Sequence, residues 1–411
     1  MQRLFPPPPI AAPVHRPIGP PVTLMRMSAL SPTLQAVRTA VEARLARALD
    51  AHRARCTGEA PAADELFDAA ADLVSSGKRM RALLGAVGLA LGEPGAAPEQ
   101  RSRLMTGAAS ASLGSALELY QASALVHDDV IDASATRRGR PTAHRRWAAQ
   151  HVSSGWRGDA AAYGKGAAIL LGDLLLSLAG IEIGRAVRPL ADGARAGVVR
   201  DAFDVMTAEV AVGQFLDVRG EMVLPPSPDD DPIASGRVML TSALTVVRRK
   251  SARYSVMHPL VIGALLGGVT SADPLHKALE IFGEEIGIAF QLRDDVLGVY
   301  GDPDLTGKPA GDDLREGKRT ALMAMAWQRA DRPGRLLLSR VLTDRDASSE
   351  LIAAAADLIR DCGALEAHEK TIAAHARAGV RALDDVPSGA LDDAGRADLS
   401  SLARALTSRS S

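Results

Sequence analysis

The chain has 411 residues, of which 47% are hydrophobic and only 3% aromatic, and its formal net charge is −1. Such a length can bury a large core, and the near-neutral charge excludes the broad basic surface with which proteins bind nucleic acid. Cys56 and Cys362 are isolated, which argues against a CxxC zinc site or a disulfide-stapled secreted domain and predicts a reducing, cytoplasmic location. Alanine and leucine outnumber the residues that strands prefer, so the composition predicts an all-α fold.

Residues 1–30 contain PPPP at 6–9 and several further prolines, a spacing that prevents regular helix and predicts a disordered arm. Because Met25 and Met27 follow this arm, a start codon assigned too early would explain it equally well. We expect a single domain over 31–411. Its first helix should begin at the N-cap Ser31 and carry an apolar stripe at helical spacing, formed by Leu34, Val37, Val41, Leu45 and Leu49.

Long apolar-periodic segments follow, separated by short polar breaks, which is typical of a large helical bundle. The breaks are expected at 92–98, 225–237, 301–317, 331–334 and 386–394.

The glycine- and arginine-rich stretch from Arg137 to Gly166 is interpreted as a long loop, of the kind that often covers an active site. Between Gly166 and Val187, Asp173 and Glu182 interrupt the most apolar stretch, so we expect no transmembrane segment.

The first of two aspartate motifs is HDDVID, at the end of an apolar run. Asp128 and Asp132 are four residues apart and would share one helix face, with Asp129 beside them. Acids that close a buried helix need a compensating cation. Hard carboxylate oxygens suit magnesium, which binds a few carboxylates together with phosphate oxygens.

The second motif, FQLRDDVLG, repeats this arrangement far along the chain. Gln291, Asp294 and Asp295 recur at i, i+3 and i+4, so they would present a second oxygen-rich face. Either motif alone is a weak signal, because acidic helix ends are common. Two such motifs predict one shared metal cluster and a phosphorylated ligand.

Lysine is rare, with 7 lysines against 41 arginines. We interpret Lys277 and Lys370 as ordinary surface charges on amphipathic helices. Four other lysines lie in polar segments, most of them glycine-containing, where a compact ammonium can reach phosphate oxygens: Lys78, Lys250, Lys308 and Lys318. Basic residues facing a metal cluster are what a diphosphate leaving group requires.

In these motifs the chain resembles the trans-isoprenyl diphosphate synthases, or polyprenyl synthetase family, and most closely the bacterial members that form geranylgeranyl diphosphate. The resemblance runs from about residue 70 to 320. It is carried by GKRMR at 77–81, DDVID at 128–132 with RRGRPT at 137–142, GDLLL at 172–176, GQFLD at 213–217, KSARY at 250–254, and FQLRDDVLG with GKPAGDDLREGKRT.

The resemblance implies a helical bundle around a central cavity, a homodimer, and residue roles. Isopentenyl diphosphate would be bound by Lys78, Arg81, Gln121 and Arg138. The allylic diphosphate would be bound by Arg137, Gln214, Lys250, Ser251, Gln291 and Lys308. Three magnesium ions would be held by Asp128, Asp132 and Asp294, and catalysis would further require Asp129, Asp295 and Lys250.

The implied reaction is a head-to-tail condensation. The diphosphate leaves an allylic carbon, the double bond of isopentenyl diphosphate attacks the resulting cation, and a proton is lost to the departing diphosphate. Oxygens of Gln214 and Ser251 could stabilise the cation through their dipoles.

Three positions depart from the usual family pattern. Gly298 replaces the last aspartate of the second motif, and we expect this change to be tolerated. Gln121 stands where many members carry histidine, although its amide can still donate to a phosphate. Ser251 replaces a common threonine and keeps the hydroxyl.

Product length should depend on residues that precede Asp128 on the same helix face. Ser123 is small, whereas Tyr120 lies one turn deeper, and a turn rises about 5.4 Å, roughly one isoprene unit. Tyr120 as the pocket floor predicts a twenty-carbon product, geranylgeranyl diphosphate. Alternatively, Tyr120 is an ordinary core aromatic with its hydroxyl at water. Leu117 and Ala116 lie beyond Tyr120, so a longer-chain polyprenyl diphosphate synthase is a further alternative.

Three rival readings remain. A terpene cyclase would share the fold but usually carries a different second motif. A non-catalytic regulatory subunit of a prenyl synthase would typically have lost an aspartate motif or a diphosphate lysine. A helical scaffold protein would leave the acids and lysines as surface charge.

Overall fold

The structure is a computed structural model, and it describes residues 31–56, 58, 60–137, 139–302, 310–344 and 346–407. In this part of the chain the regular secondary structure is helical apart from one antiparallel hairpin, formed by β1 (Thr136–Arg137) and β2 (Arg140–Pro141). The all-α prediction is therefore confirmed. The proline-rich arm, Arg138 and Lys308 lie outside the described residues.

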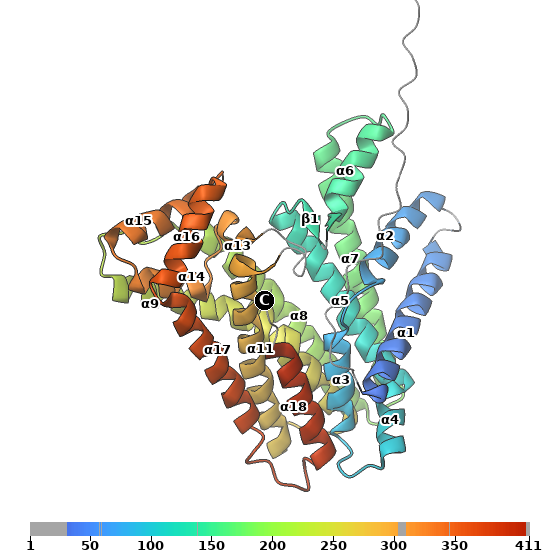
Figure 1. Cartoon of the computed structure of the whole chain (residues 1–411). Helices are drawn as coiled ribbons and strands as arrows, with labels where there is room; N and C mark the ends of the chain where they lie inside the picture. The colour runs from blue at the N-terminus through green and yellow to red at the C-terminus, as the bar shows by residue number, and fades with distance from the viewer. Residues whose placement is uncertain are drawn as a thin grey trace, which may run out of the picture.

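Long helices stand side by side in the centre of the molecule (Figure 1). The central elements are α3 (Met80–Ala90), α5 (Ala108–Ile131), α7 (Ala160–Val187), α8 (Gly193–Met222), η2 (Val247–Met257), α10 (His258–Gly267) and α11 (Pro274–Tyr300). α5 packs on α7, α3 packs on α10, and α11 packs on both η2 and α17 (Ala364–Arg381).

The remaining helices surround this centre. One flank and the base are formed by α1 (Pro32–Cys56), η1 (Pro61–Ala63), α2 (Asp64–Val74) and α4 (Pro98–Thr106). The opposite flank is formed by α9 (Pro232–Val246), α13 (Asp312–Arg315), α14 (Ala321–Arg329), α15 (Arg332–Thr343) and α16 (Ser349–Asp361). α6 (Ala143–Ser153), α17 (Ala364–Arg381) and α18 (Asp393–Thr407) complete the bundle.

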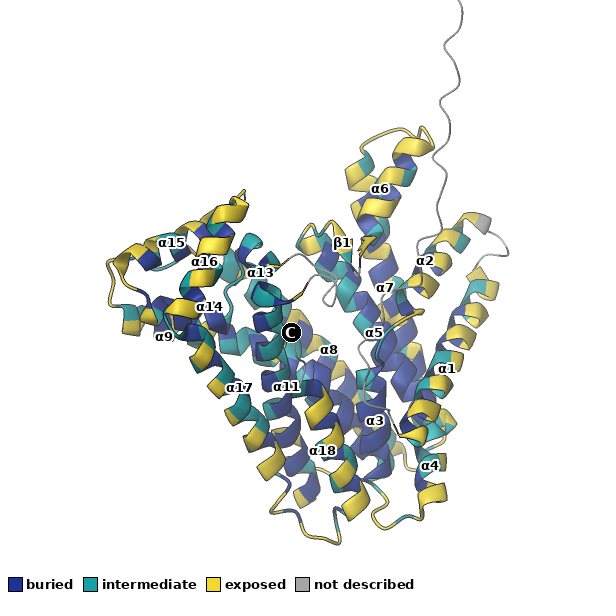
Figure 2. Cartoon of the chain, in the orientation of Figure 1, coloured by how far each residue is buried: buried dark blue, intermediate teal, exposed yellow. Residues whose placement is uncertain are grey.

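Figure 2 shows that the central helices are buried while the outer faces are exposed. The main core includes Leu83, Leu117 and Phe282, none of which exposes any side-chain surface. A second core surrounds the buried Trp327 between α14, α15 and α16. The expected stripe Leu34 to Leu49 is buried on α1, so the first predicted helix is confirmed.

The prediction of a long loop from Arg137 to Gly166 is wrong. After the hairpin the chain forms α6, and α7 already begins at Ala160. The sequence contains the reason, because His144, Trp147 and His151 recur at helical spacing and are all buried. Asp159 then caps α7 by accepting a hydrogen bond from the backbone of Ala162.

α7 is, among the described residues, the one helix long and apolar enough to cross a membrane by length and composition. It packs along α5 and α6 in the fold, and 44% of its most apolar window is buried. The core helix of a bundle has the same composition, so this feature is weak evidence for a span, and the absence of one stays a prediction.

Candidate functional site

The first aspartate motif lies at the C-terminal end of α5, which ends at Ile131. Arg137 of the hairpin donates through Nε to Asp129 Oδ1 at 2.7 Å and also reaches Asp128 Oδ2 at 3.4 Å. Asp128 and Asp129 point to different sides of α5, because neighbouring residues are about 100° apart on a helix. One arginine therefore joins the two carboxylates.

Lys250 approaches the same motif from η2. Its Nζ lies 3.2 Å from Asp128 Oδ1 and 2.6 Å from Asp217 Oδ2 on α8. Gln214, one turn before Asp217, donates to Asp128 Oδ1 at 3.1 Å. These elements can meet because Gly213 lets the backbones of α8 and η2 touch, since a Cβ at this position would overlap the backbone of Lys250.

η2 is a π-helix, whose wider turn is frequent at functional sites. The next residue along it, Ser251, donates a short hydrogen bond to Oε1 of Gln291 on α11. Gln291 Nε2 in turn donates to Asp295 Oδ1 at 3.1 Å. Lys250 and Ser251 therefore connect the two aspartate motifs, which confirms that these distant segments come together.

The second motif lies within α11 rather than at its end, since the helix continues to Tyr300. The side of α11 next to Gly298 is occupied by the carboxylate of Asp313 from α13, and any Cβ at Gly298 would overlap it. Lys318 Nζ lies 3.4 Å from Asp313 Oδ1 and 2.7 Å from Glu316 Oε2. The motif that lacks its last aspartate thus has a carboxylate from another segment in its place.

The site holds more negative charge than its lysines and arginines fully compensate. Burial opposes ionisation of Asp128, but Lys250 and Arg137 outweigh it and hold the pKa of this carboxyl below its usual range. Burial, then the charge of Asp128, raises the pKa of Asp132 to about 6. Burial, then the charge of Asp313, raises the pKa of Asp295 to about 8. A bound cation would relieve both raised values.

The donor set fits magnesium. Asp295 Oδ2 is buried with no hydrogen-bond partner, as an acceptor awaiting a cation or water would be. Within the described residues, no three His, Cys, Asp or Glu side chains are grouped so that they could hold a metal ion by themselves. Such an open set suits an ion that keeps water ligands and completes its shell with substrate phosphate oxygens.

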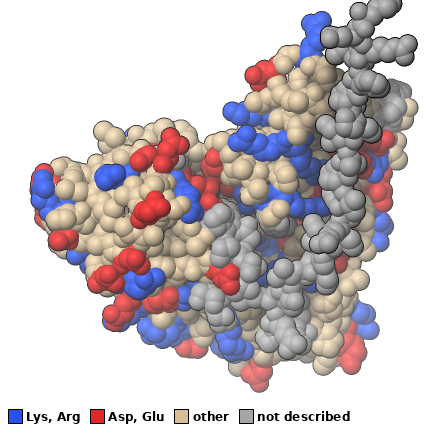
Figure 3. Space-filling model, turned by 45° about the horizontal axis from the view of Figure 1, so that its top comes forward, with Lys and Arg blue, Asp and Glu red and all other residues tan. Residues whose placement is uncertain are grey.

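Lys318 is electrostatically coupled to both motifs. Its charge helps to lower the pKa of Asp128 and partly opposes the rise in the pKa of Asp132 and Asp295, and its own pKa is raised well above the usual value because Asp313 and Glu316 outweigh the effect of burial. Figure 3 brings the top of the bundle forward and shows Lys and Arg side chains gathered in a band on the α6 side of this face. Acids and cations therefore share one end of the bundle.

The GKRMR segment leads into α3. Arg81 Nη2 donates to Ser255 Oγ at 2.7 Å, and its guanidinium lies 4.1 Å from the ring centroid of Tyr254. Lys78 lies in the turn before the helix, directly before Arg79. Gln121 lies on α5, two turns before Asp128. Their use as one diphosphate site stays a prediction.

Arg79 has a left-handed backbone, with φ of 55°, which is uncommon for a residue with a side chain. The side chain is buried and lies 3.3 Å from Glu118 Oε2, while Nη2 donates a short hydrogen bond to the carbonyl of Val74. A buried ion pair with α5 therefore fixes the turn that carries Lys78.

Tyr120 lies on α5, about two turns before Asp128, and its side chain packs against α8 and η2. Its hydroxyl donates to the carbonyl of Thr207 at 3.2 Å, and its ring contacts Phe203 and Tyr254 edge-on, with centroids 6.2 and 5.5 Å away. The hydroxyl therefore donates to the protein backbone instead of to water, which corrects that part of the alternative, whereas the buried ring agrees with its other part, that Tyr120 is a core aromatic. Ser123 instead faces α7, where its hydroxyl donates to the carbonyl of Gly172 at 2.7 Å.

Two residues of the site were not singled out from the sequence. Asp217 follows Gln214 at i+3, so helical spacing within GQFLD could have found it. Asp313 gave no such signal, because its relation to Gly298 depends on how α13 packs against α11.

Comparison with known proteins agrees with this geometry. Residues 63–359 match the family model for polyprenyl synthetase. A geranylgeranyl pyrophosphate synthase structure from Corynebacterium glutamicum, complexed with isoprenyl diphosphate and magnesium, is 35% identical with a TM-score of 0.78, and the alignment covers 92% of this chain and 99% of that one.

Curated relatives differ in product. A geranylgeranyl diphosphate synthase from Sulfolobus acidocaldarius is 31% identical over 60% of this chain and 65% of its own length, slightly under two thirds of that enzyme. A (2E,6E)-farnesyl diphosphate synthase from Mycobacterium bovis is 32% identical over 71% of this chain and 72% of its own. The chain belongs to the polyprenyl synthetase family and is a trans-prenyltransferase.

Proposed function

We propose that this trans-prenyl diphosphate synthase condenses isopentenyl diphosphate with an allylic diphosphate to give geranylgeranyl diphosphate. The observation that carries the proposal is the bridge formed by η2. Lys250 contacts Asp128, and Ser251 contacts Gln291 beside Asp295. Two acidic faces with a lysine between them form a site for a diphosphate that must be neutralised before it leaves.

In this proposal Arg137, Lys250 and Lys308 bind the allylic diphosphate, with Gln214, Ser251 and Gln291 as hydrogen-bonding partners. Three magnesium ions, when bound by Asp128, Asp132 and Asp294, would neutralise charge on the leaving diphosphate. Asp129 and Asp295 orient this cluster through Arg137 and Gln291.

Isopentenyl diphosphate binds to Lys78, Arg81, Gln121 and Arg138. As the allylic C–O bond breaks, the π electrons of the isopentenyl diphosphate double bond form the new C–C bond to the allylic carbon. The proton then passes from the adjacent carbon to the departed diphosphate, which restores a double bond. Lys250 and Arg137 hold that diphosphate close enough to accept it.

Product length is proposed to be set by Tyr120, with Ser123 one turn nearer the metal site. Tyr120 is fixed by its hydrogen bond to Thr207 and by edge contacts with Phe203 and Tyr254. Such an aromatic cluster resists displacement by a growing chain. The relatives make both fifteen- and twenty-carbon products, so the length must be measured on this chain.

We propose a cytoplasmic homodimer that buries the outer face of α7 and α8. Val198, Val205 and Val212 recur every seven residues along α8 and are 48%, 59% and 49% exposed. Leu170 on α7 is 62% exposed. Light scattering should give twice the chain mass, and Leu170→Glu with Val205→Glu should give the single mass, whereas Val238→Glu on α9 should not.

Magnesium-dependent release of pyrophosphate tests the proposal against the regulatory-subunit alternative. The wild type should release pyrophosphate when both substrates are present, and Asp128→Asn should lose this activity while keeping its helix content. Circular dichroism provides the folding control. Absence of release from a folded wild type, with every allylic primer, would favour the non-catalytic subunit.

A further inference from the structure

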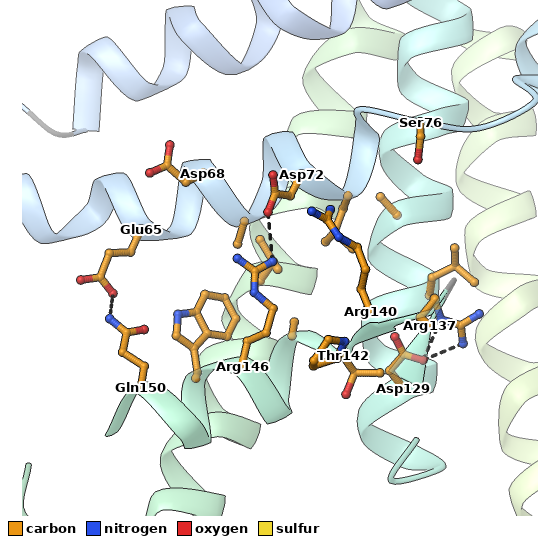
Figure 4. A pocket seen from close by; sticks show the side chains of 18 residues that line it. Glu65, Asp68, Asp72, Ser76, Asp129, Arg137, Arg140, Thr142, Arg146 and Gln150 are labelled. Atoms are coloured by element: carbon orange, nitrogen blue, oxygen red, sulfur yellow. Dashed lines mark hydrogen bonds and ion pairs between the residues drawn. The ribbon is translucent and has the colours of Figure 1, made fainter. Parts of the chain in front are cut away.

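A cavity of about 400 Å³ is lined by Asp129 of the first aspartate motif and by Arg137 (Figure 4), but not by Asp128 or Asp132. It lies between α2, α5, α6, α7 and the hairpin. Its volume is within the range of about 300 to 1,000 Å³ typical of small-molecule sites. No residue proposed to bind isopentenyl diphosphate lines it within the described part of the chain.

The cavity has an apolar wall. Leu73 comes from α2, Leu125 from α5, Trp147 from α6 and Leu171 from α7, and Ala69 leaves space between them. Trp147 and Leu171 are buried, so this wall is part of the core rather than a surface groove. Such a lining favours a hydrocarbon chain over a polar metabolite.

Charged groups surround the apolar wall, and most of them are already paired. Arg146 binds Asp72 at 3.1 Å, and Gln150 donates to Glu65 at 2.9 Å. Asp68 is paired with Arg53 of α1.

Arg140 differs from these groups. It is exposed and extends toward the cavity in Figure 4, and although its backbone pairs with Arg137 in the hairpin, its side chain has no hydrogen-bond or ion-pair partner among the residues that the structure describes. The remaining arginine of the lining, Arg137, is shared with the metal site through Asp129 and Asp128.

We propose that this cavity is a second binding site for an amphiphile with an isoprenoid chain and an anionic head, and that its occupancy restrains the metal site. The chain would pack on Leu125 and Trp147, and the head would pair with Arg140 and compete for Arg137. An Arg137 drawn toward this head would leave Asp128 and Asp129. Because the proposed product has this chemistry, the ligand assignment rests on the proposed function.

Binding can be measured without turnover. Geranylgeranyl diphosphate is titrated into the full chain in EDTA, which removes metal-dependent diphosphate binding at the active site, and tryptophan fluorescence is followed. We expect a saturable change that disappears in Trp147→Phe. Arg140→Ala should weaken binding at least about tenfold, since a charge-assisted contact is lost. The matched control Arg145→Ala, an exposed arginine of α6 that does not line the cavity, should bind as the wild type does.

A second variant tests the apolar part of the cavity without changing any charge on the protein. Ala69→Phe should fill the apolar part of the cavity and abolish the fluorescence change, and geranylgeraniol, which lacks the anionic head, should bind at least about tenfold more weakly than the diphosphate. In turnover assays, inhibition by added product should persist at saturating substrates and be relieved in Arg140→Ala.

Purely competitive inhibition, or a wild type that shows no fluorescence change in EDTA, would overturn the inference. These outcomes are distinct from failure of the proposed function. An active enzyme without this binding refutes the second site alone, and binding without condensation refutes the proposed reaction alone.

Discussion

The carboxylate of Asp313 lies against Gly298, in the space that any side chain at this position of the second aspartate motif would need. The same carboxylate lies 3.4 Å from Lys318 and is, after burial, the largest cause of the raised pKa of Asp295. A residue with a Cβ at this position would therefore have to displace the Asp313 carboxylate, and the missing aspartate does not leave the motif short of negative charge.

Gly298→Ala should consequently disturb the site although it adds only a methyl group. The new Cβ would displace Asp313 and with it Lys318, and a shift of about 1 Å in such a site can cost about 100-fold in rate. Steady-state kinetics at saturating magnesium measures this loss. Gly197→Ala on α8 is the control, because its Cβ would meet open space.

The double variant Gly298→Asp with Asp313→Gly moves the carboxylate back to α11. It should recover part of the activity that Gly298→Ala loses. Full activity in Gly298→Ala would show that the position of Asp313 does not matter for catalysis.

Arg79→Ala should raise the Michaelis constant for isopentenyl diphosphate at least about tenfold and change kcat less, because the turn that carries Lys78 loses its anchor on Glu118. Thermal stability should also fall, since Glu118 would be left buried without its partner. Arg79→Lys keeps the charge and should restore part of the affinity.

A purely structural role would give a different result. Arg101 is a second buried arginine, and it ties α4 to Asp398 at 2.8 Å. Arg101→Ala should therefore lower the Tm without changing this Michaelis constant. If Arg79→Ala behaves in the same way, Arg79 does not position the diphosphate site.

Tyr120→Ala should lengthen the product by at least one isoprene unit, because removal of the ring deepens the pocket by about one helical turn, which is roughly the length of that unit. Chromatography of the dephosphorylated alcohols measures the length. Tyr120→Phe keeps the ring and loses only the hydrogen bond to Thr207, so its product should match that of the wild type. An unchanged length in Tyr120→Ala would place the floor elsewhere.

Asp295 should make the metal-free protein less stable as pH rises. Its pKa is about 8 in the folded state and about 3.8 in the unfolded chain, so between these values the folded protein keeps a proton that the unfolded chain has released. The unfolded state binds fewer protons, and the free energy of unfolding therefore falls with pH.

The corresponding measurement is a set of thermal melts in EDTA. Asp295→Asn should raise the Tm at pH 8 by at least about 3 °C, and the difference should shrink toward pH 5. The exposed Asp385→Asn should show no such trend. A Tm difference that does not vary with pH would contradict the buried, protonated carboxyl.

The residues of the site that could be predicted from the sequence are those that recur at helical spacing within one segment. Asp128 and Asp132 are four apart on a helix that does end there, and Gln291 and Asp295 do share a face of α11. The pairing of Lys250 with Asp217 needs the close approach at Gly213, and the contact of Ser251 with Gln291 needs a π-helix, neither of which has a reliable sequence signal.

The error at α6 has a different origin. Arginine and glycine suggested a loop, although the buried His144, Trp147 and His151 already followed a helical period. Their burial depends on α7, against which α6 packs, and tertiary packing of this kind overrides local composition. The second cavity was unpredictable for the same reason, since four separate helices form it.

The most direct test of the central claim is the chain length of the product. Purified protein is incubated with magnesium, labelled isopentenyl diphosphate and dimethylallyl, geranyl or farnesyl diphosphate in turn, and the dephosphorylated products are separated by length. The account predicts a dominant twenty-carbon alcohol that disappears in EDTA and in Asp128→Asn. Absence of condensation with all three primers would contradict the proposed reaction, and a dominant product of another length would contradict the role of Tyr120.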